Sequence, residues 1–183
     1  YNMAWRALGV QFIYFGVVLF YFFTASNPQA APIPLGVNYG TVADNLPPPS
    51  EVVALLKTTI ITKVKLFSVD GTILNAFANS GIEIMVGIGD DQIKPLANGG
   101  VPAAKEWVNA NVAPYVPATD IAYLSVGNEV LSASDGEMIW DLQFAMENLY
   151  TACQELGFVD IKVTTPHSMG LLRSSDPPSN GSF

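Results

Sequence analysis

The pair Asn128-Glu129 suggests chemistry most directly, because it follows the apolar run Ile121 to Val126 after a single glycine. Such a position predicts a partly buried carboxyl group, and partial burial raises the pKa of a carboxyl. The group can then stay protonated near neutral pH and donate a proton to a leaving oxygen, while the adjacent amide orients a substrate hydroxyl. A helix-capping or solvated glutamate accounts for the same residues equally well.

Other polar groups that follow apolar runs are weaker candidates. Tyr39 is expected either to pack its ring against a bound sugar ring or to be a core residue with a hydrogen-bonded hydroxyl. Asp90 and Asp91 suggest a hard-cation site, but two carboxylates without supporting ligands are more typical of a turn and a helix cap. His167 either lines a cleft or is structural. We therefore expect no metal ion.

The composition and the motifs exclude several classes of protein. The chain has 8 Lys and Arg against 16 Asp and Glu, a net charge of −8, whereas a nucleic-acid partner requires basic surface. Cys153 is the single cysteine, so neither an internal disulfide framework nor a thiolate zinc site can form, and we expect it to be a small buried residue. No dinucleotide fingerprint, P-loop or nucleophile elbow is present, and no cofactor is expected.

Short β-rich runs alternate with helical patterns from residue 31 onwards. Strands are predicted at 35–40, 63–67, 82–88, 121–126 and 161–165, and helices open near Ser50-Glu51 and Asp70 and cover 103–112 and 135–156. This alternation predicts a parallel sheet with right-handed crossovers. Ligands gather at the carboxyl ends of parallel strands, so the candidates above are expected at one edge of the sheet.

Two α/β architectures fit five such units: a doubly wound open sheet, or the first five strands of a (β/α)8 TIM barrel. Barrels of this type typically span about 250 residues, which is more than the globular part, residues 31–183, contains. A barrel therefore requires further strands. An open sheet of five strands would instead be a stable domain by itself.

Residues 1–30 have the layout of a secretory signal peptide. Arg6 is the only charge in this stretch, the run from Phe12 to Phe23 is apolar, and small polar residues follow it. The run is short for a membrane span, which needs about 20 apolar residues, so we expect cleavage between Ser26 and Ala31. Export makes the sequon at Asn180 an expected glycosylation site.

Five short motifs occur along the globular part in a fixed order. They are Leu35-Gly36-Val37-Asn38-Tyr39-Gly40, Asn45-Leu46-Pro47-Pro48-Pro49-Ser50, Lys63-Val64-Lys65-Leu66-Phe67, Val126-Gly127-Asn128-Glu129-Val130 and Lys162-Val163-Thr164-Thr165-Pro166-His167-Ser168. Together they resemble plant glycoside hydrolase family 17, the glucan endo-1,3-β-glucosidases.

The resemblance implies a (β/α)8 barrel that hydrolyses internal linkages of β-1,3-glucans such as callose, retaining the anomeric configuration through a covalent glycosyl-enzyme. By position, Glu129 resembles the family's general acid/base, Asn128 the residue that binds the sugar 2-hydroxyl, and Tyr39 a tyrosine of the sugar cleft. The family's nucleophile is a glutamate in a later Glu-Thr-Gly-Trp-Pro type segment, and nothing after Val163 matches it. We therefore expect these 183 residues alone to be inactive and poorly soluble. Ser68 departs from the aspartate that relatives commonly carry.

Three interpretations stay open on these grounds. The first is an enzyme acting on extracellular β-1,3-glucan, and the second is a non-catalytic glucan-binding or structural protein of the same fold. The third is the open-sheet domain. The resemblance implies a polysaccharide partner and no obligate protein partner. It also implies a secreted or cell-wall protein of wall remodelling or plant defence, and leaves plasma-membrane anchoring through a further C-terminal region open.

Overall fold

Five parallel strands form one sheet in the computed structural model, which describes residues 34–132 and 135–182. Their bounds are β1 Leu35–Tyr39, β2 Ile61–Leu66, β3 Glu83–Ile88, β4 Ile121–Val126 and β5 Lys162–Thr164. Their spatial order is the chain order, and every neighbouring pair is parallel. A doubly wound sheet reverses direction at a switch point, whereas a barrel adds each strand beside the last. The order therefore confirms the barrel interpretation, and the described residues supply five of its eight strands.

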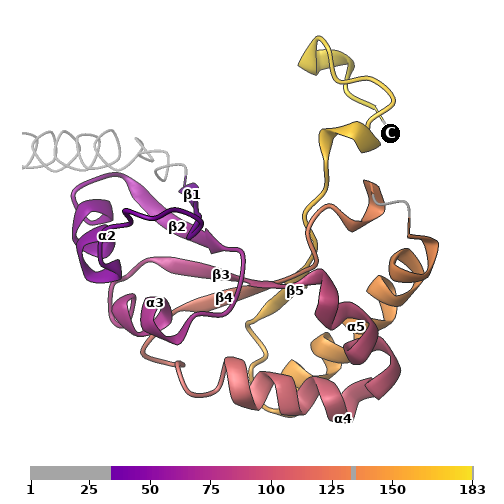
Figure 1. Cartoon of the computed structure of the whole chain (residues 1–183), viewed down its shortest axis with the longest axis horizontal. Coiled ribbons are helices and arrows are strands. Elements are labelled where there is room, and N and C mark those ends of the chain that lie inside the picture. Colours follow the sequence, from indigo (N-terminus) through magenta and orange to yellow (C-terminus); the bar gives the residue numbers. More distant parts are fainter. Residues whose placement is uncertain (1–33, 133–134, 183) are drawn as a thin grey trace, which may run out of the picture. The chain divides into compact units, whose positions relative to one another are not determined.

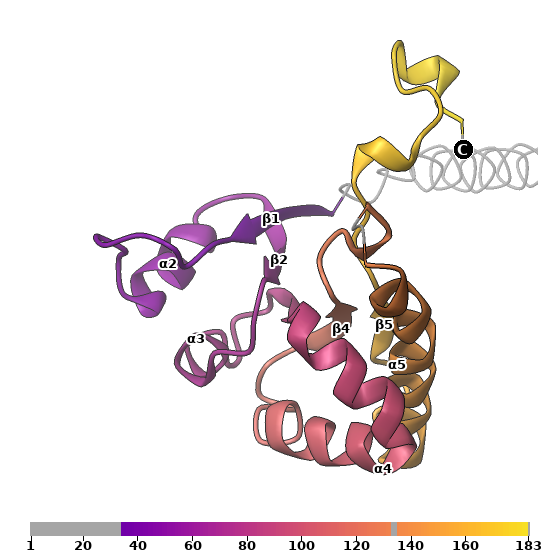
Figure 2. The same ribbon diagram turned by 45° about the vertical axis from the view of Figure 1, so that its right-hand side comes forward.

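Helices connect the strands and cover one face of the sheet. Figures 1 and 2 show the α-helices gathered on one side, with α4 and α5 packed against each other. The helical elements are α2 Pro49–Leu56, α3 Gly71–Ala76, α4 Ile93–Asn111 and α5 Gly136–Glu155, with the 3-10 turns η1 Asp90–Gln92, η2 Val130–Ser132, η3 Met169–Leu171 and η4 Pro178–Asn180.

The two faces of the sheet differ in chemistry because side chains alternate along each strand. The face under the helices forms the core, and its strand residues of at most 2% exposure include Val64, Leu66, Ile84, Val86, Leu124 and Val126. The opposite face is polar and lines a hollow of ≈ 340 Å³ with Asn38, Lys63, Lys65, Glu83, Met85 and Tyr123. On that face Lys63 Nζ lies 2.6 Å from Glu83 Oε1 and 5.6 Å from the centre of the Tyr123 ring.

Helix α3 begins where the sequence predicts. The Asp70 carboxylate accepts hydrogen bonds from the backbone N–H groups of Thr72 at 2.8 Å and Ile73 at 3.1 Å, which satisfies donors that have no partner inside the helix. Leu74 and Phe77 follow on the buried face and have no exposed surface. The cap and the apolar spacing therefore fix both the start and the orientation of this short helix.

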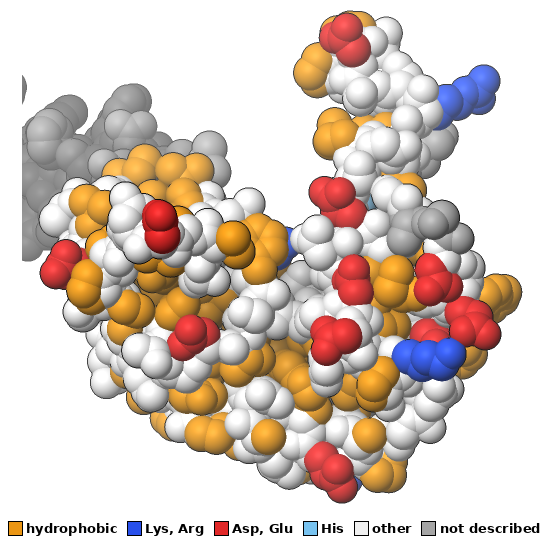
Figure 3. Space-filling model, in the orientation of Figure 1, with side chains coloured by type: hydrophobic (Ala, Val, Ile, Leu, Met, Phe, Trp, Pro, Cys, Tyr) orange, Lys and Arg blue, Asp and Glu red, His pale blue; other side chains and the backbone are white. Residues whose placement is uncertain are grey.

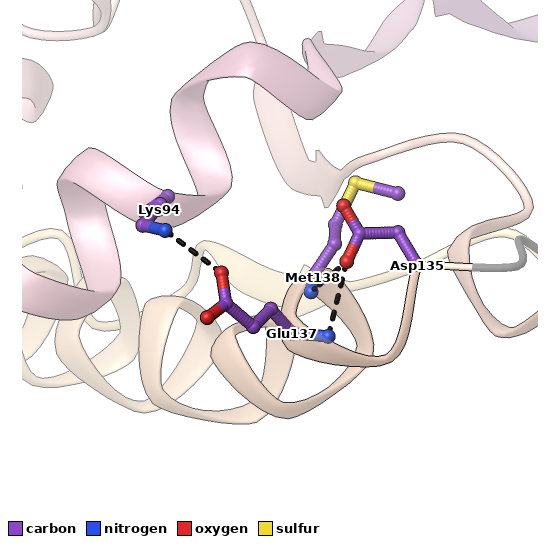
Figure 4. A network of polar contacts seen from close by, with 4 residues as sticks. All are labelled: Lys94, Asp135, Glu137 and Met138. Carbon is purple, nitrogen blue, oxygen red and sulfur yellow. Dashed lines mark hydrogen bonds and ion pairs between the residues drawn. The ribbon is translucent and has the colours of Figure 1, made fainter.

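Helices α4 and α5 begin close together, as the close view in Figure 4 shows. Asp135 caps α5 by accepting from the N–H groups of Glu137 and Met138 at 3.0 and 3.2 Å. The Glu137 carboxylate then reaches Lys94 Nζ in the first turn of α4, at 2.9 Å. Both side chains of this ion pair are largely exposed, so solvent screens the pair and it contributes little to stability. The interface between α4 and α5 is therefore stabilised mainly by packing of the two helices.

One predicted helix start is wrong, and a second helix begins as predicted but lacks a side-chain cap. Helix α4 begins at Ile93 rather than near 103, because Pro95 falls in the first turn, where its missing N–H costs nothing, and the chain kinks at Gly100 with φ 64° before continuing. Helix α2 begins at Pro49 with Pro48 as N-cap and no capping side chain, so Ser50-Glu51 does not cap it. Proline at the first helical position fixes φ and replaces the cap.

Within residues 34–132 and 135–182, no helix is both long and apolar enough to span a membrane. The predicted signal peptide, residues 1–30, lies outside the part of the chain that the structure describes. On the face shown in Figure 3, separate acidic side chains outnumber basic ones, in keeping with the net charge of −8.

Candidate active site

Three hydrogen bonds donated by backbone N–H groups hold the loop Gly127–Glu129, called here the Glu129 loop, at the carboxyl ends of the strands. Its three successive N–H groups donate to Ile88 O at 2.8 Å, to Asp90 Oδ1 at 2.8 Å and to Pro166 O at 3.3 Å. Ile88 ends β3, Asp90 begins η1, and Pro166 follows β5. The loop is therefore tied to the segments after both strands that flank β4.

The backbone of the Glu129 loop is left-handed at two of its three residues. Gly127 has φ 68° and Glu129 has φ 58°. Glycine adopts this conformation freely, but a residue with a Cβ atom pays about 1–2 kcal/mol. The hydrogen bonds to neighbouring segments hold Glu129 in it, and backbone strain of this kind clusters at functional sites.

The side chains of Asn128 and Glu129 are exposed, while Gly127 and Val130 on either side are buried. The expected partial burial of the Glu129 carboxyl is therefore wrong for this structure. The left-handed turns rotate the polar pair away from the apolar strand that precedes it. Apolar neighbours in the sequence thus bury the backbone of the loop without burying the carboxyl group.

A pocket of ≈ 380 Å³ opens beside the loop, and Asn128 lines it together with Lys65, Phe67, Gly87, Ile88, Gly89, Asp90, Asp91, Ser125 and Gly127. Lys65 Nζ lies 4.7 Å from the centre of the half-exposed Phe67 ring. Burial lowers the pKa of Lys65, and the nearby Glu129 carboxylate opposes this by favouring the ammonium form. One wall of the pocket is thus an aromatic ring with a cation that faces Glu129.

Ser125 supplies a hydroxyl group at the back of the same pocket. Its side chain has no exposed surface, and within the described residues its Oγ has no hydrogen-bond partner. Buried hydroxyl groups are normally paired. The pocket therefore combines an amide, a hydroxyl, a cation, carboxylates and an aromatic face, which are groups suited to binding a polyhydroxylated ligand.

Tyr39 lies at the end of β1, where its ring packs against Phe77 with 6.4 Å between ring centres. Burial raises the pKa of the Tyr39 hydroxyl, and the Asp70 carboxylate adds to the effect. Tyr39 is partly buried and is not among the residues that line the pocket around Asn128. The structure therefore brings Asn128 and Glu129 together and places Tyr39 against the helix layer.

The remaining candidates lie outside this arrangement or play smaller parts in it. His167 is exposed and follows the carbonyl group that holds Glu129, and Asp91 accepts a hydrogen bond from the Gln92 side chain at 2.7 Å. Cys153 is fully buried, and burial raises its pKa to about 11. Ser68 lines a neighbouring pocket of ≈ 340 Å³. Asn180 is exposed at the end of η4.

Sequence reasoning missed the parts that Asp90 and Lys65 play in this site. Strand alternation contained the signal for Lys65, since residues 63, 65 and 67 share the face opposite the buried Val64 and Leu66. Asp90 was considered only as a cap or a cation ligand. Its position directly after β3, beside the strand that carries Glu129, was the available signal.

The fold and the site define the class: an α/β-barrel protein whose polar site lies at the carboxyl ends of its parallel strands, where barrel enzymes carry their active sites. No cluster of three or more His, Cys, Asp or Glu side chains arranged to bind a metal ion occurs among the described residues.

Comparison with known proteins specifies the class further. The family model for "Glycosyl hydrolases family 17" matches residues 35–183. Glucan endo-1,3-beta-glucosidase 7 of Arabidopsis thaliana is 44% identical over 172 residues, covering 93% of this chain and 33% of that protein. A glucan endo-1,3-beta-glucosidase of Triticum aestivum is 44% identical over 153 residues, covering 81% and 33%.

A solved structure agrees with these sequence matches. CJP38, a beta-1,3-glucanase and allergen of Cryptomeria japonica pollen, superimposes with a TM-score of 0.75 at 39% identity over 82% of this chain and 48% of that one. The chain belongs to glycosyl hydrolase family 17. It spans about a third of the length of the curated relatives it matches.

Proposed function

We propose that the whole protein is a retaining endo-hydrolase of 1,3-β-D-glucosidic linkages in β-1,3-glucan, with Glu129 as its general acid/base. Relatives at 41–44% identity are named glucan endo-1,3-β-glucosidases, and the family model covers the described residues. The observation that carries the proposal is the constrained Glu129 loop, which presents an exposed carboxyl group beside a polar pocket at the catalytic edge of a barrel.

Each residue of the site has a chemical task in this proposal. Glu129 donates a proton to the oxygen of the departing sugar and then accepts a proton from the water that replaces it. Asn128 donates from its amide to the 2-hydroxyl of the sugar on the other side of the bond, where such contacts strengthen in the transition state. Tyr39, at the carboxyl end of β1, is assigned to the sugar cleft by the family resemblance, and its ring packs against Phe77.

Retention requires a second carboxyl group about 5–5.5 Å from the first. We infer that a glutamate on a later strand supplies this nucleophile in the whole protein, so residues 1–183 by themselves do not turn over glucan. Within the described residues β5 pairs with one neighbour only, β4, which leaves its other edge open. An open edge favours association between chains, so the isolated chain is expected to be poorly soluble.

The test is Glu129→Gln in the whole protein, assayed by the reducing ends released from laminarin. Loss of the transferable proton should lower kcat by about 10²- to 10⁴-fold, and the exposed position should leave thermal unfolding unchanged. Unaltered turnover in the variant would remove Glu129 from the acid/base role. Glucan binding without turnover in the unsubstituted whole protein would instead favour a non-catalytic glucan-binding protein of the same fold.

We also propose that the protein is exported and acts in the extracellular space or cell wall, on callose-type glucan in wall remodelling or defence. This proposal rests on the uncharged, apolar stretch from Phe12 to Phe23, which is followed by small polar residues. Glycosylation at Asn180, whose side chain is exposed, is consistent with this route.

A further inference from the structure

We propose that Asp90 is a positioning residue that sets the direction of the Glu129 carboxyl group by holding the loop through a single side-chain hydrogen bond. The inference rests on the proposed function, because it assigns Asp90 a part in the same reaction. Asp90 Oδ1 accepts from Asn128 N–H at 2.8 Å, across 38 residues of sequence.

Among the three hydrogen bonds that the N–H groups of the Glu129 loop donate, the one from Asn128 is the one that substitution of the partner's side chain can remove. The N–H groups of Gly127 and Glu129 donate to main-chain carbonyl groups, which exist whatever side chain Ile88 or Pro166 carries. The central N–H donates to a carboxylate, and charge-assisted bonds of this kind are stronger than neutral ones. The side chain of residue 90 therefore decides whether the middle of the loop is held.

Asp90 is itself fixed in place. It begins η1 directly after Gly89, and Gln92 N–H closes that turn on Gly89 O at 3.0 Å. Its Oδ1 also lies against Gly127, where an added Cβ atom would be 3.1 Å from it. The Asp90 carboxylate thus lies near Gly127 and accepts from Asn128 N–H, so its position and that of the loop are linked.

The left-handed conformation makes this bond important. Glu129 holds φ 58°, which is strained for a residue with a Cβ atom, so the loop relaxes toward ordinary dihedral angles when a restraint is lost. Rotation about the backbone at residues 128 and 129 would move the carboxyl group away from the scissile oxygen. Misplacement of a catalytic group by about 1 Å costs on the order of 100-fold in rate.

The test compares Asp90→Ala with Asp90→Asn in the whole protein, with laminarin as substrate. The alanine variant should lose kcat by about 10- to 100-fold with KM changed by less than about threefold, because the acid is displaced while most binding groups stay. The asparagine variant should retain most of kcat, since its amide oxygen can accept the same bond. Asp160→Ala, which removes an equal charge from an exposed position lining a pocket away from the Glu129 loop, should behave like the unsubstituted protein.

A substrate with a dinitrophenyl leaving group distinguishes misplacement of the Glu129 carboxyl group from a general loss of active-site structure. That group departs without a proton, so the Asp90→Ala defect in the departure step should shrink toward the unsubstituted rate. A defect in kcat/KM, which reports the departure step, that is equally large on both substrates would overturn the proposal, as would an asparagine variant as impaired as the alanine variant. Full activity of Asp90→Ala on laminarin would do the same.

If Asp90→Ala does not fold, Asp90→Glu takes its place, because its longer side chain keeps the charge but shifts the carboxylate. Asp90→Asn should then exceed Asp90→Glu in kcat, and the reverse order would contradict a role for the hydrogen bond. Glu129→Gln, assayed beside these variants, distinguishes failure of the proposed function from failure of the positioning role of Asp90. An active Glu129→Gln overturns the proposed function, whereas an inactive one with a fully active Asp90→Ala overturns the positioning role alone.

Discussion

Substitution of Gly127 by alanine should distort the Glu129 loop more than any comparable glycine change among the described residues. Gly127 has φ 68°, and a Cβ atom added there would collide with Val130 Cγ2. The same atom would lie 3.0 Å from Ile93 Cδ1 and 3.1 Å from Asp90 Oδ1. Val130 and Ile93 are buried, so neither can move aside into solvent.

Two costs add at this position. The left-handed backbone costs alanine about 1–2 kcal/mol, and overpacking a buried contact costs about 1–3 kcal/mol. The free energy of unfolding should therefore fall by about 2–5 kcal/mol in Gly127→Ala. Turnover should fall as well, because relief of the collision requires movement of the loop that carries Glu129.

Two other glycines allow the two costs to be measured separately. Gly81 has φ 76° with no atom within 4 Å of an added Cβ, so Gly81→Ala should show the backbone cost alone, about 1–2 kcal/mol. Gly136 has no positive φ and equally open surroundings, in the first turn of α5. Gly136→Ala should be neutral or stabilising by up to about 1 kcal/mol.

The measurement is the denaturant midpoint of the whole protein and each variant, compared at equal slope. The expected order of stability is Gly136→Ala, then Gly81→Ala, then Gly127→Ala. A Gly127→Ala midpoint no lower than that of Gly81→Ala would refute the steric argument. Val130→Ala in the Gly127→Ala background adds a second check, since removal of Cγ2 should cost less there than in the unsubstituted protein.

The remaining predictions concern Cys153 and the leader. Burial raises the pKa of Cys153 to about 11, so a thiol reagent at pH 8 should label it only after denaturation. Rapid labelling of the native protein would contradict its burial. Because the folded state holds this proton more tightly than the unfolded state, stability should decrease as the pH rises from about 9 toward 11, by denaturant titration at each pH. A reporter protein fused behind residues 1–30 should appear in the culture medium without them, and a reporter retained in the cell would refute export.

The strands were predictable from the sequence because each carries its own local signal. The fourth strand occupies Ile121–Val126 in both the prediction and the structure, since six consecutive residues of an apolar, β-favouring run are bounded by Asp120 and Gly127. The long helix differs from its predicted bounds by one residue at each end, because Asp135 caps its start and Gly157, with φ 86°, follows its end.

Features that depend on the whole sheet were not predictable from local patterns. The alternation of five strand-helix units fits an open sheet and a barrel equally well, and the family resemblance and then the observed order β1 to β5 favour the barrel. The predicted helix at 103–112 corresponds to the part of α4 after the kink at Gly100, and the part from Ile93, which carries Pro95 in its first turn, was missed. Both outcomes depend on where neighbouring elements pack, which local propensity does not report.

In the site, too, the residue types were predictable from a short stretch of sequence, whereas their exposure was not. Asn128 and Glu129 were found because their types and their position after a strand are visible in a short stretch of sequence. The exposure of Glu129 was not foreseen, because it follows from the positive φ angles at Gly127 and Glu129 rather than from the apolar residues beside them.

The direction of the Glu129 carboxyl group is therefore a property of three strand ends. Ile88 O and Pro166 O hold the ends of the loop, and Asp90 holds its centre, so residues 38 positions upstream and 37 downstream contribute to one dihedral arrangement. Parallel strands bring these segments together because their carboxyl ends meet at one edge. A short motif can thus specify a candidate acid, whereas the direction of its carboxyl group depends on neighbouring strands of the barrel. This explains why a carboxylate at position 90 carries chemical meaning that the sequence around it does not reveal.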